Sequence, residues 1–158
     1  MLDDSTLQRC LDSAYRYLSY RARSEAELRK YLCRRSFDDE VVDKTISNLK
    51  EQELIDDLAF AESWRDSRLS SQPRSKRLIA QELKDKKVAR EIIERIIENV
   101  NDEDSAYRLA CRRLHLLTHL DYPEFRRRLS SYLAYRGFSY EVIRQTAVRL
   151  WQENKSKT

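Results

Sequence analysis

The chain has 158 residues, of which 37% are charged and 41% hydrophobic, with only one glycine and two prolines. This length suits one domain or a short array of small ones, and so little glycine and proline leaves room for few tight turns. No apolar run approaches the roughly 20 residues that cross a bilayer, and the N-terminus lacks the apolar core of a signal peptide. We therefore expect a cytoplasmic protein without a membrane partner.

Cysteine usage and charge distribution narrow the class further. Cys10, Cys33 and Cys111 are odd in number and far apart, so we expect no disulfide framework and interpret all three as small buried apolar residues. The net charge of +4 is uneven, because residues 102–158 carry 11 Lys and Arg against 7 Asp and Glu, whereas residues 1–53 carry 10 against 11. This asymmetry predicts an anionic partner for one end of the chain.

The first 50 residues have the pattern of three amphipathic helices. Five apolar residues at helical spacing define the first helix: Leu7, Leu11, Ala14, Tyr15 and Leu18. Ser24 followed by Glu27 has the spacing of a capping box, which predicts that a second, short helix begins after Ser24. Asp38 is the expected cap of a third helix, whose inward face carries Val41, Val42, Thr45, Ile46 and Leu49.

The apolar pattern of these helices then recurs twice, with a period of about 50 residues. Seven positions repeat with offsets of 51 and 101: Leu28, Leu32, Phe37, Val41, Val42, Ile46 and Leu49; Ile79, Leu83, Val88, Ile92, Ile93, Ile97 and Val100; Leu129, Leu133, Phe138, Val142, Ile143, Ala147 and Leu150. Regular self-similarity of this kind is typical of stacked helical repeats, which present long binding surfaces.

The punctuation of the chain agrees with this period. Both prolines, Pro73 and Pro123, fall in the connection before a second helix, and Gly137 follows a second helix as a left-handed C-terminal cap. The sequence thus predicts an all-α fold of three tandem three-helix repeats, stacked into an elongated, curved body. The expected boundaries are 1–53, 54–101 and 102–153, with a disordered tail over 154–158.

Four stretches in this order and spacing resemble the RecX family of bacterial recombination regulators: RSEAELRKYL at 23–32, LIDDLAFAESW at 54–64, RLIAQELKDKKV at 77–88 and LAYRGFSYEVI at 133–143. The resemblance extends over about residues 8–152. The chain departs from the family where Gln52-Glu53 and Gln72-Pro73 replace turns that often contain glycine, and where Lys86-Lys87-Val88 replaces a Lys-Gly-Ile segment. These departures affect the expected turn geometry more than the assignment.

The resemblance implies a protein that binds RecA, the ATP-dependent recombinase that polymerises on single-stranded DNA. Family members are understood to lie in the helical groove of the RecA filament and to restrain filament growth, ATP hydrolysis, strand exchange and repressor co-cleavage. The expected partner is therefore the RecA filament, with DNA as a further partner of basic faces, and the chain itself is expected to be a monomer.

Two groups of cations are the candidate contacts with RecA or DNA. The first lies in the basic stretch 73–90 and comprises Arg74, Lys76, Arg77, Lys84, Lys86 and Lys87. The second comprises Arg112, Arg113, Arg126, Arg127 and Arg128, although three consecutive arginines span too much of a helix to address one ligand. If these cations are functional, both groups contact phosphates or an acidic protein surface. The alternative hypothesis is that they only form the solvated face of their helices.

Other residue patterns favour structural roles. Tyr15, Tyr17, Tyr20, Tyr132 and Tyr135 are numerous enough for base stacking, but aromatic residues at helical spacing are usually core, and Tyr15 aligns with Phe60 in the repeat. Cys111, His115 and His119 would lie along one helix over about 12 Å, too far apart for one metal ion, so we expect partial burial and no metal.

The sequence favours a binding function over catalysis. One glycine cannot form a phosphate-cradling loop, and nothing supports a nucleophile–histidine–acid arrangement, so no catalytic residue and no cofactor are expected. Two alternatives to a RecA modulator stay open, namely an independent helical module that binds nucleic acid and a general helical-repeat scaffold for another protein.

Overall fold

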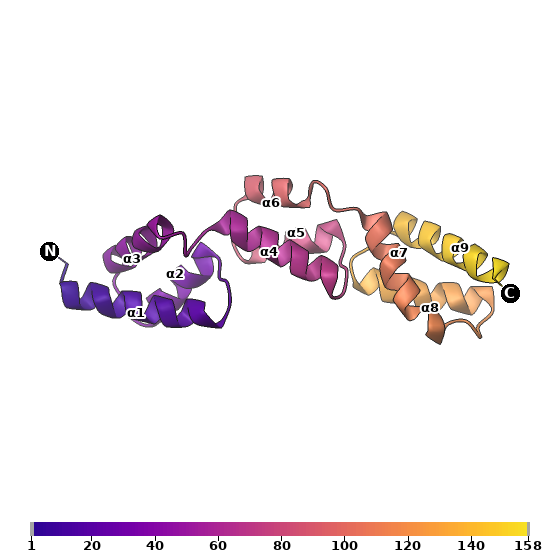
Figure 1. Cartoon of the computed structure of the whole chain (residues 1–158), viewed down its shortest axis with the longest axis horizontal. Coiled ribbons are helices and arrows are strands. Elements are labelled where there is room, and N and C mark those ends of the chain that lie inside the picture. The colour runs from indigo at the N-terminus through magenta and orange to yellow at the C-terminus, as the bar shows by residue number, and fades with distance from the viewer. Residues whose placement is uncertain (1, 158) are drawn as a thin grey trace. The chain divides into compact units, whose positions relative to one another are not determined.

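The computed structural model describes residues 2–157, and all of its regular structure is helical, which confirms the all-α prediction (Figure 1). Met1 and Thr158, the outer ends of the predicted first repeat and of the predicted tail, lie outside the described residues. The elements follow one another as α1 (Asp4–Tyr20), α2 (Glu25–Arg34), α3 (Asp39–Glu51), α4 (Asp57–Ser70), α5 (Lys76–Asp85), α6 (Arg90–Ile97), α7 (Asp102–Arg113), the 3-10 helix η1 (Leu114–Leu116), α8 (Tyr122–Tyr135) and α9 (Tyr140–Ser156).

These helices form two compact units by their mutual contacts. The first unit comprises Met1–Ser63 with Leu83–Arg95, and the second comprises Trp64–Glu82 with Ile96–Thr158. The middle repeat therefore contributes to both units, although the predicted boundaries at 53/54 and 101/102 fall in the connections before α4 and α7.

The core of the first unit lies among α1, α2 and α3, which all contact one another. Its fully buried side chains include Leu28 and Leu32 from α2 and Val42 and Leu49 from α3, all members of the repeated apolar series. Ala14 of α1 is also inaccessible. Burial of one apolar face on each helix is what holds these short helices in place, because isolated helices of this length are marginal in water.

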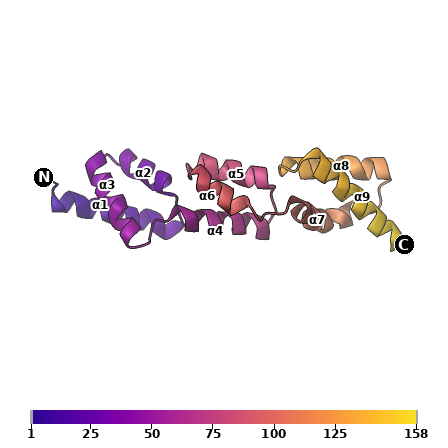
Figure 2. The same ribbon diagram turned by 90° about the horizontal axis from the view of Figure 1, so that it is seen from above.

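The third repeat packs in the same way within the second unit. Helix α9 contacts both α7 and α8, and the orange α8 and yellow α9 lie side by side in both views (Figures 1 and 2). Phe125, Leu129 and Leu133 of α8 and Leu150 of α9 are buried in this core. The equivalent positions of the middle repeat, Ile79 and Leu83, are buried as well, so the apolar period is a core period throughout the described chain.

The second helix of every repeat ends in the same left-handed turn. Ser36, Lys87 and Gly137 all have positive φ angles, of 68°, 59° and 90°. In each case the next amide donates back to the carbonyl of the last buried leucine, Leu32, Leu83 or Leu133, which is the hydrogen bond of a Schellman motif. Gly137 is thus a left-handed cap as predicted. The departure at Lys86-Lys87-Val88 leaves this turn intact, with a lysine in the conformation that glycine favours.

The turn after α3 shows the same substitution. Glu53 has a φ of 58°, and the amide of Leu54 donates to the Leu49 carbonyl over 2.9 Å. This is the place where the chain has Gln52-Glu53 in place of a turn that often contains glycine. Side chains other than glycine lose roughly 1–2 kcal/mol in this conformation. The repeat therefore keeps its turn geometry at a cost in stability.

Two core assignments are corrected by the structure. Tyr15 is 38% exposed, with its hydroxyl bonded to Gln52, because its position on α1 faces away from the core that Ala14 joins. In the middle repeat Ile96 is almost fully buried whereas Ile97 is only partly so. The position of Ile96 corresponds to Thr45 and Thr146 of the other repeats, and both threonines are buried, which confirms the inward position predicted for Thr45.

The end of the chain also differs from expectation. Residues 154–156 belong to the expected disordered tail but continue α9. Lys157 is the C-cap residue, and its backbone amide donates a hydrogen bond to the Asn154 carbonyl. The hydroxyl of Ser156 donates to the Gln152 carbonyl over 2.9 Å. Helical hydrogen bonds thus extend to a polar segment that carries no apolar pattern.

Candidate partner-binding surfaces

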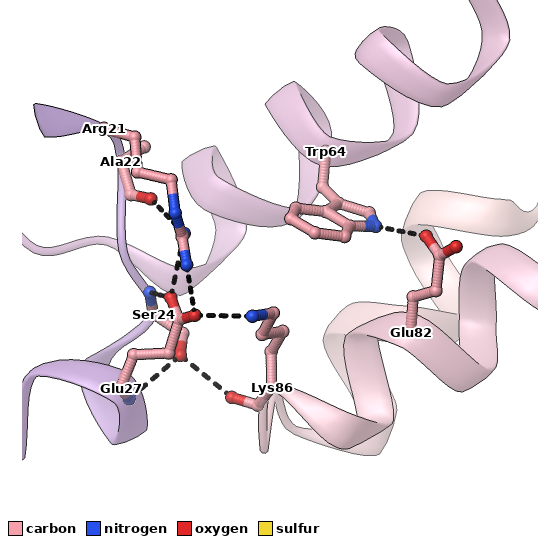
Figure 3. Close-up of polar contacts among 7 residues, drawn as sticks. All are labelled: Arg21, Ala22, Ser24, Glu27, Trp64, Glu82 and Lys86. Carbon is pink, nitrogen blue, oxygen red and sulfur yellow. Dashed lines mark hydrogen bonds and ion pairs between the residues drawn. The ribbon is translucent and has the colours of Figure 1, made fainter. Parts of the chain in front are cut away.

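A polar junction joins the start of α2 to the middle repeat in the first unit. The Ser24 hydroxyl accepts from the Glu27 amide and donates to the Lys86 carbonyl, and the Glu27 carboxylate reaches back to the Ser24 amide (Figure 3). The predicted capping box is therefore present. The next amide, that of Glu25, donates to Asp57 at the start of α4 over 2.8 Å. A local cap thus also fastens one repeat to the next.

Glu27 is the electrostatic centre of this junction. Its carboxylate pairs with Arg21 and with Lys86, both over 2.7 Å (Figure 3). Burial alone would raise the pKa of Glu27, but the hydrogen bonds from Arg21, Lys86 and the Ser24 amide lower that pKa to about 2. The carboxylate is therefore ionised at neutral pH, and it holds the Lys86 ammonium in an ion pair.

An equivalent junction stands at the start of α5 in the second unit. Ser75 is fully buried, its amide donates to the Arg136 carbonyl over 3.1 Å, and its hydroxyl accepts from the Leu78 amide. The Lys76 amide donates to Asp102 at the start of α7 over 2.8 Å. Gly137 lies so close to Ser75 that a Cβ atom built on the glycine would approach the hydroxyl oxygen to 2.4 Å. The two junctions have the same design: a serine caps the second helix, and an aspartate at the start of the following repeat accepts from the amide after that serine.

A second carboxylate that is partly buried, that of Glu82, joins α5 to α4 in the middle repeat. Glu82 accepts from the Trp64 indole over 2.7 Å, pairs with Arg68 over 2.8 Å and also pairs with Arg74 (Figure 3 shows the indole bond). Burial raises the pKa of Glu82, whereas Arg68 and the Trp64 indole lower it by a larger combined amount. Arg74 is thus committed to an internal cluster.

The structure divides the basic stretch 73–90 into committed and exposed cations. Arg74 and Lys86 are ion-paired as described, and Lys76 is partly buried with its ammonium near the Glu98 carbonyl. Arg77, Lys84 and Lys87 are exposed to solvent. Arg77 and Lys84 lie seven residues apart on α5, which is the spacing of one helical face.

A basic cavity in the first unit contains two cations outside the predicted groups, Lys30 and Arg34. It has a volume of about 340 Å³, and its lining includes Lys30 and Arg34 of α2 together with Lys86 and Lys87. Tyr31 also lines it. The signal that could have found the α2 cations is the spacing of Lys30 and Arg34, which puts both on one helical face. Their proximity to Lys86 and Lys87 depends on the fold.

Two tyrosines of the first unit, Tyr17 and Tyr31, are partners for arginine. Tyr17 and Tyr31 stack with ring centroids 3.9 Å apart. The Arg23 guanidinium lies 3.9 Å from the Tyr17 centroid, and that of Arg35 lies 5.6 Å from the Tyr31 centroid. This column of rings and guanidiniums holds α1 against α2, which supports the structural role proposed for Tyr17.

The second predicted group, the arginines of the third repeat, separates into three environments. Arg112 donates to the Ser71 carbonyl over 2.6 Å, and Arg126 donates to the Tyr140 hydroxyl. Arg113 stacks over the Tyr132 ring at 4.6 Å. Arg127 and Arg128 both pair with Glu124 and keep 66% and 51% of their side chains exposed. The fold brings Arg113, Arg127 and Arg128 to one cavity of about 570 Å³, and Arg126 is not among its lining residues, so the three consecutive arginines do not all address one site.

Cys111, His115 and His119 do not share a helix. Helix α7 ends at Arg113, a 3-10 turn follows, and all three side chains are exposed, contrary to the predicted partial burial. Cys33 is exposed too, so only Cys10 fits the expectation of buried cysteines. Within residues 2–157 no three His, Cys, Asp or Glu side chains are placed to hold a metal ion.

Over the described part of the chain none of the helices combines the length and the apolar character that a bilayer crossing needs.

Comparison with known proteins matches all three repeats. Models of the first, second and third three-helix domains of RecX match residues 10–49, 56–96 and 101–146. Regulatory protein RecX of Prosthecochloris aestuarii is 31% identical over 92% of this chain and 95% of its own length, and that of Chlorobium limicola is 32% identical over 88% and 87%. The crystal structure of RecX from Lactobacillus salivarius shares the fold, with a TM-score of 0.79 and 22% identity over 92% of this chain and 97% of its own. The chain belongs to the RecX family of regulatory proteins.

Proposed function

We propose that this protein is a non-enzymatic modulator of RecA that acts mainly as an inhibitor. It binds in the groove of the RecA–DNA filament and restrains filament growth, ATP hydrolysis, strand exchange and co-protease activity. The observation that carries the proposal is the match of all three RecX domains, in order, over most of the chain. Inhibition of ATP hydrolysis then follows from occupancy of the filament.

The exposed cations of the middle repeat are the contacts that we propose for the filament. Lys84 and Lys87 are solvent-exposed in the first unit, and neither is drawn into the junction that occupies Lys86. An exposed ammonium keeps its charge available for a carboxylate or a phosphate, whereas the Lys86 ammonium, which is mostly buried, would first have to leave Glu27. Arg74 and Lys86 are therefore assigned to folding, and Lys84 and Lys87 to binding.

The test is a titration of the protein into RecA filaments on single-stranded DNA, with DNA-dependent ATP hydrolysis as the readout. We expect the wild-type chain to lower the hydrolysis rate, and Lys84→Glu with Lys87→Glu to raise the concentration needed for half-inhibition by about tenfold. The matched control is Lys44→Glu, another exposed lysine of the first unit, which should leave inhibition unchanged. A wild-type chain that neither binds the filament nor alters hydrolysis would refute the proposal.

The basic cavity of the first unit favours a second candidate, direct binding of nucleic acid. Two carboxylates, Glu27 and Asp85, also line this cavity, but they are outnumbered by four cations, and a net positive lining attracts a phosphate backbone: Lys30, Arg34, Lys86 and Lys87. This candidate predicts tight binding to oligonucleotides in the absence of RecA, with an affinity that falls steeply as salt rises. Filament inhibition without measurable binding to free DNA favours the RecA modulator.

A further inference from the structure

The structure points to a second docking site, in the third repeat, for a partner that the proposed function does not assign. The site is the cavity of about 570 Å³ between the end of α7, η1 and α8, drawn in orange in Figure 1. Its volume lies within the range of ligand pockets, about 300–1,000 Å³. We propose that this cavity binds a peptide segment of a partner protein in which an apolar side chain is flanked by carboxylates.

The cationic part of the cavity is made of arginine. Arg113, Arg127 and Arg128 line it, and no lysine does. A guanidinium offers a planar fork of donors that matches a carboxylate in a bidentate manner, and arginine is enriched in protein interfaces where lysine is depleted. This composition favours a protein ligand with acidic groups.

Glu124 holds two of these arginines in place. Arg127 donates to both oxygens of the Glu124 carboxylate, from Nε over 3.0 Å and from Nη2 over 2.6 Å, and Arg128 donates from Nε over 2.9 Å, yet both side chains stay more than half exposed. Each guanidinium has further N–H groups beyond those that Glu124 accepts. The arginines are thus oriented before a ligand arrives, which lowers the entropy that binding must overcome.

The apolar part of the cavity is formed by the 3-10 turn. Leu117 is buried and forms its inner surface, whereas Leu116 is 47% exposed beside the arginines. An exposed leucine in a concavity gains from contact with an apolar side chain of a ligand. Charge therefore selects an acidic segment, and the leucine selects an apolar residue within it.

Tyr132 distinguishes a peptide from a nucleic acid. Its ring also lines the cavity, but the guanidiniums of Arg113 and Arg136 lie over it, 4.6 and 4.2 Å from its centroid. Single-stranded nucleic acids bind largely by stacking their bases on free aromatic rings. A ring already covered by two guanidiniums offers no such platform, so the cavity recognises a peptide better than a base.

The experiment uses the full chain and fluorescein-labelled probes, followed by anisotropy and by the methyl NMR signals of Leu116 and Leu117. The first probe is a short peptide of alternating leucine and glutamate, the second replaces its leucines with serine, and the third is oligothymidylate. We expect the first probe to bind and to shift both methyl signals, and the serine probe to bind about tenfold more weakly. Loss of the leucine contact is the physical reason.

Charge reversal provides the matched comparison. Arg127→Glu should weaken binding of the leucine–glutamate peptide by about tenfold or more, because it adds repulsion as well as removing a donor. Arg144→Glu is the control, since the exposed Arg144 is likewise bonded to a glutamate three residues earlier on its helix and lies outside the cavity. Leu116→Ser should weaken the same peptide, and Arg127→Glu decides the question if Leu116→Ser does not fold.

Three outcomes would overturn the proposal. The leucine–glutamate peptide leaves the Leu116 and Leu117 signals unmoved; Arg127→Glu and Arg144→Glu weaken binding equally; or oligothymidylate shifts these signals and competes with the peptide, which would identify a nucleic-acid site. None of these measurements involves RecA, so the result stands apart from the test of the proposed function.

Discussion

Gly137→Ala tests how tightly the second and third repeats are joined within the second unit. An alanine at φ +90° adopts a left-handed conformation that costs roughly 1–2 kcal/mol. Its Cβ would also lie 2.4 Å from the Ser75 hydroxyl oxygen and 2.9 Å from the Leu78 Cβ. Ser75 cannot move away freely, because its hydroxyl caps α5 and such a cap contributes about 0.5–2 kcal/mol. Alanine also stiffens the unfolded chain, which offsets part of this cost, so we expect a total destabilisation of about 2–3 kcal/mol.

The assay is urea unfolding followed by tryptophan fluorescence. The chain has two tryptophans, Trp64 and Trp151, and both belong to the second unit, so the fluorescence reports the unit that contains Gly137. Circular dichroism at the same urea concentrations reports the helices of both units. We expect the fluorescence midpoint to shift to lower urea by more than the dichroism midpoint.

A double-mutant cycle separates the clash from the backbone strain. Ser75→Ala removes the hydroxyl that the new Cβ would meet, so it should cost less in the Gly137→Ala background than in the wild type, with a coupling of about 1 kcal/mol. Gly137→Asn is a further control, because asparagine tolerates the left-handed region but carries the same Cβ. If Ser75→Ala and Gly137→Ala are additive within about 0.5 kcal/mol, the close approach does not limit stability and the reasoning is refuted.

Three further predictions concern the other turns and the buried carboxylates. Lys87→Gly should stabilise the first unit by roughly 0.5–1 kcal/mol, because it relieves a positive φ angle; an unchanged thermal midpoint by circular dichroism would count against this. Glu27→Gln should reduce the acid sensitivity of folding. The pKa of Glu27 is about 2 in the folded chain, below the ordinary 4.5, so the ionised carboxylate stabilises the wild type above about pH 4.5 and this stabilisation is lost towards pH 2. The free energy of unfolding measured by denaturation should therefore differ less between pH 7 and pH 3 in the variant than in the wild type. Glu82→Ala should destabilise the second unit by about 2–4 kcal/mol, because Arg68, Arg74 and the Trp64 indole all lose their acceptor; a Trp64 emission spectrum and a stability like those of the wild type would contradict it.

The fold could be predicted from the sequence because its signals are local. The capping box at Ser24 and Glu27 and the left-handed turn at Gly137 each depend on a few neighbouring residues, and the apolar period marks the faces that pack. The pattern is wrong where helical spacing alone does not decide burial. Tyr15 has the spacing of a core residue but is 38% exposed, and Ile97 belongs to the apolar series although its neighbour Ile96 is the more deeply buried residue.

The candidate surfaces could be predicted only in part, because sequence shows charges but not their partners. Lys86 is neutralised by Glu27, 59 residues away, and this contact decides that Lys86 is structural while its neighbour Lys87 is exposed. Arg113 and Arg128 face one cavity only because α7 gives way to a 3-10 turn that reverses the chain into α8. Neither contact leaves a trace in spacing or composition.

The serine–aspartate junctions have a consequence for how such a chain can be shortened or lengthened. The amide after each cap, that of Glu25 or Lys76, is satisfied by an aspartate that the repeat pattern assigns to the following repeat. A fragment cut at residue 53 would therefore lose Asp57, and with it an acceptor for its own second helix. The repeat boundaries that are visible in the sequence therefore do not coincide with the boundaries of a segment in which every helix cap has its hydrogen-bond acceptor. A gene that gains or loses one of these repeats keeps its helices capped only if each inserted segment is followed by another that begins with an acidic residue in the same register.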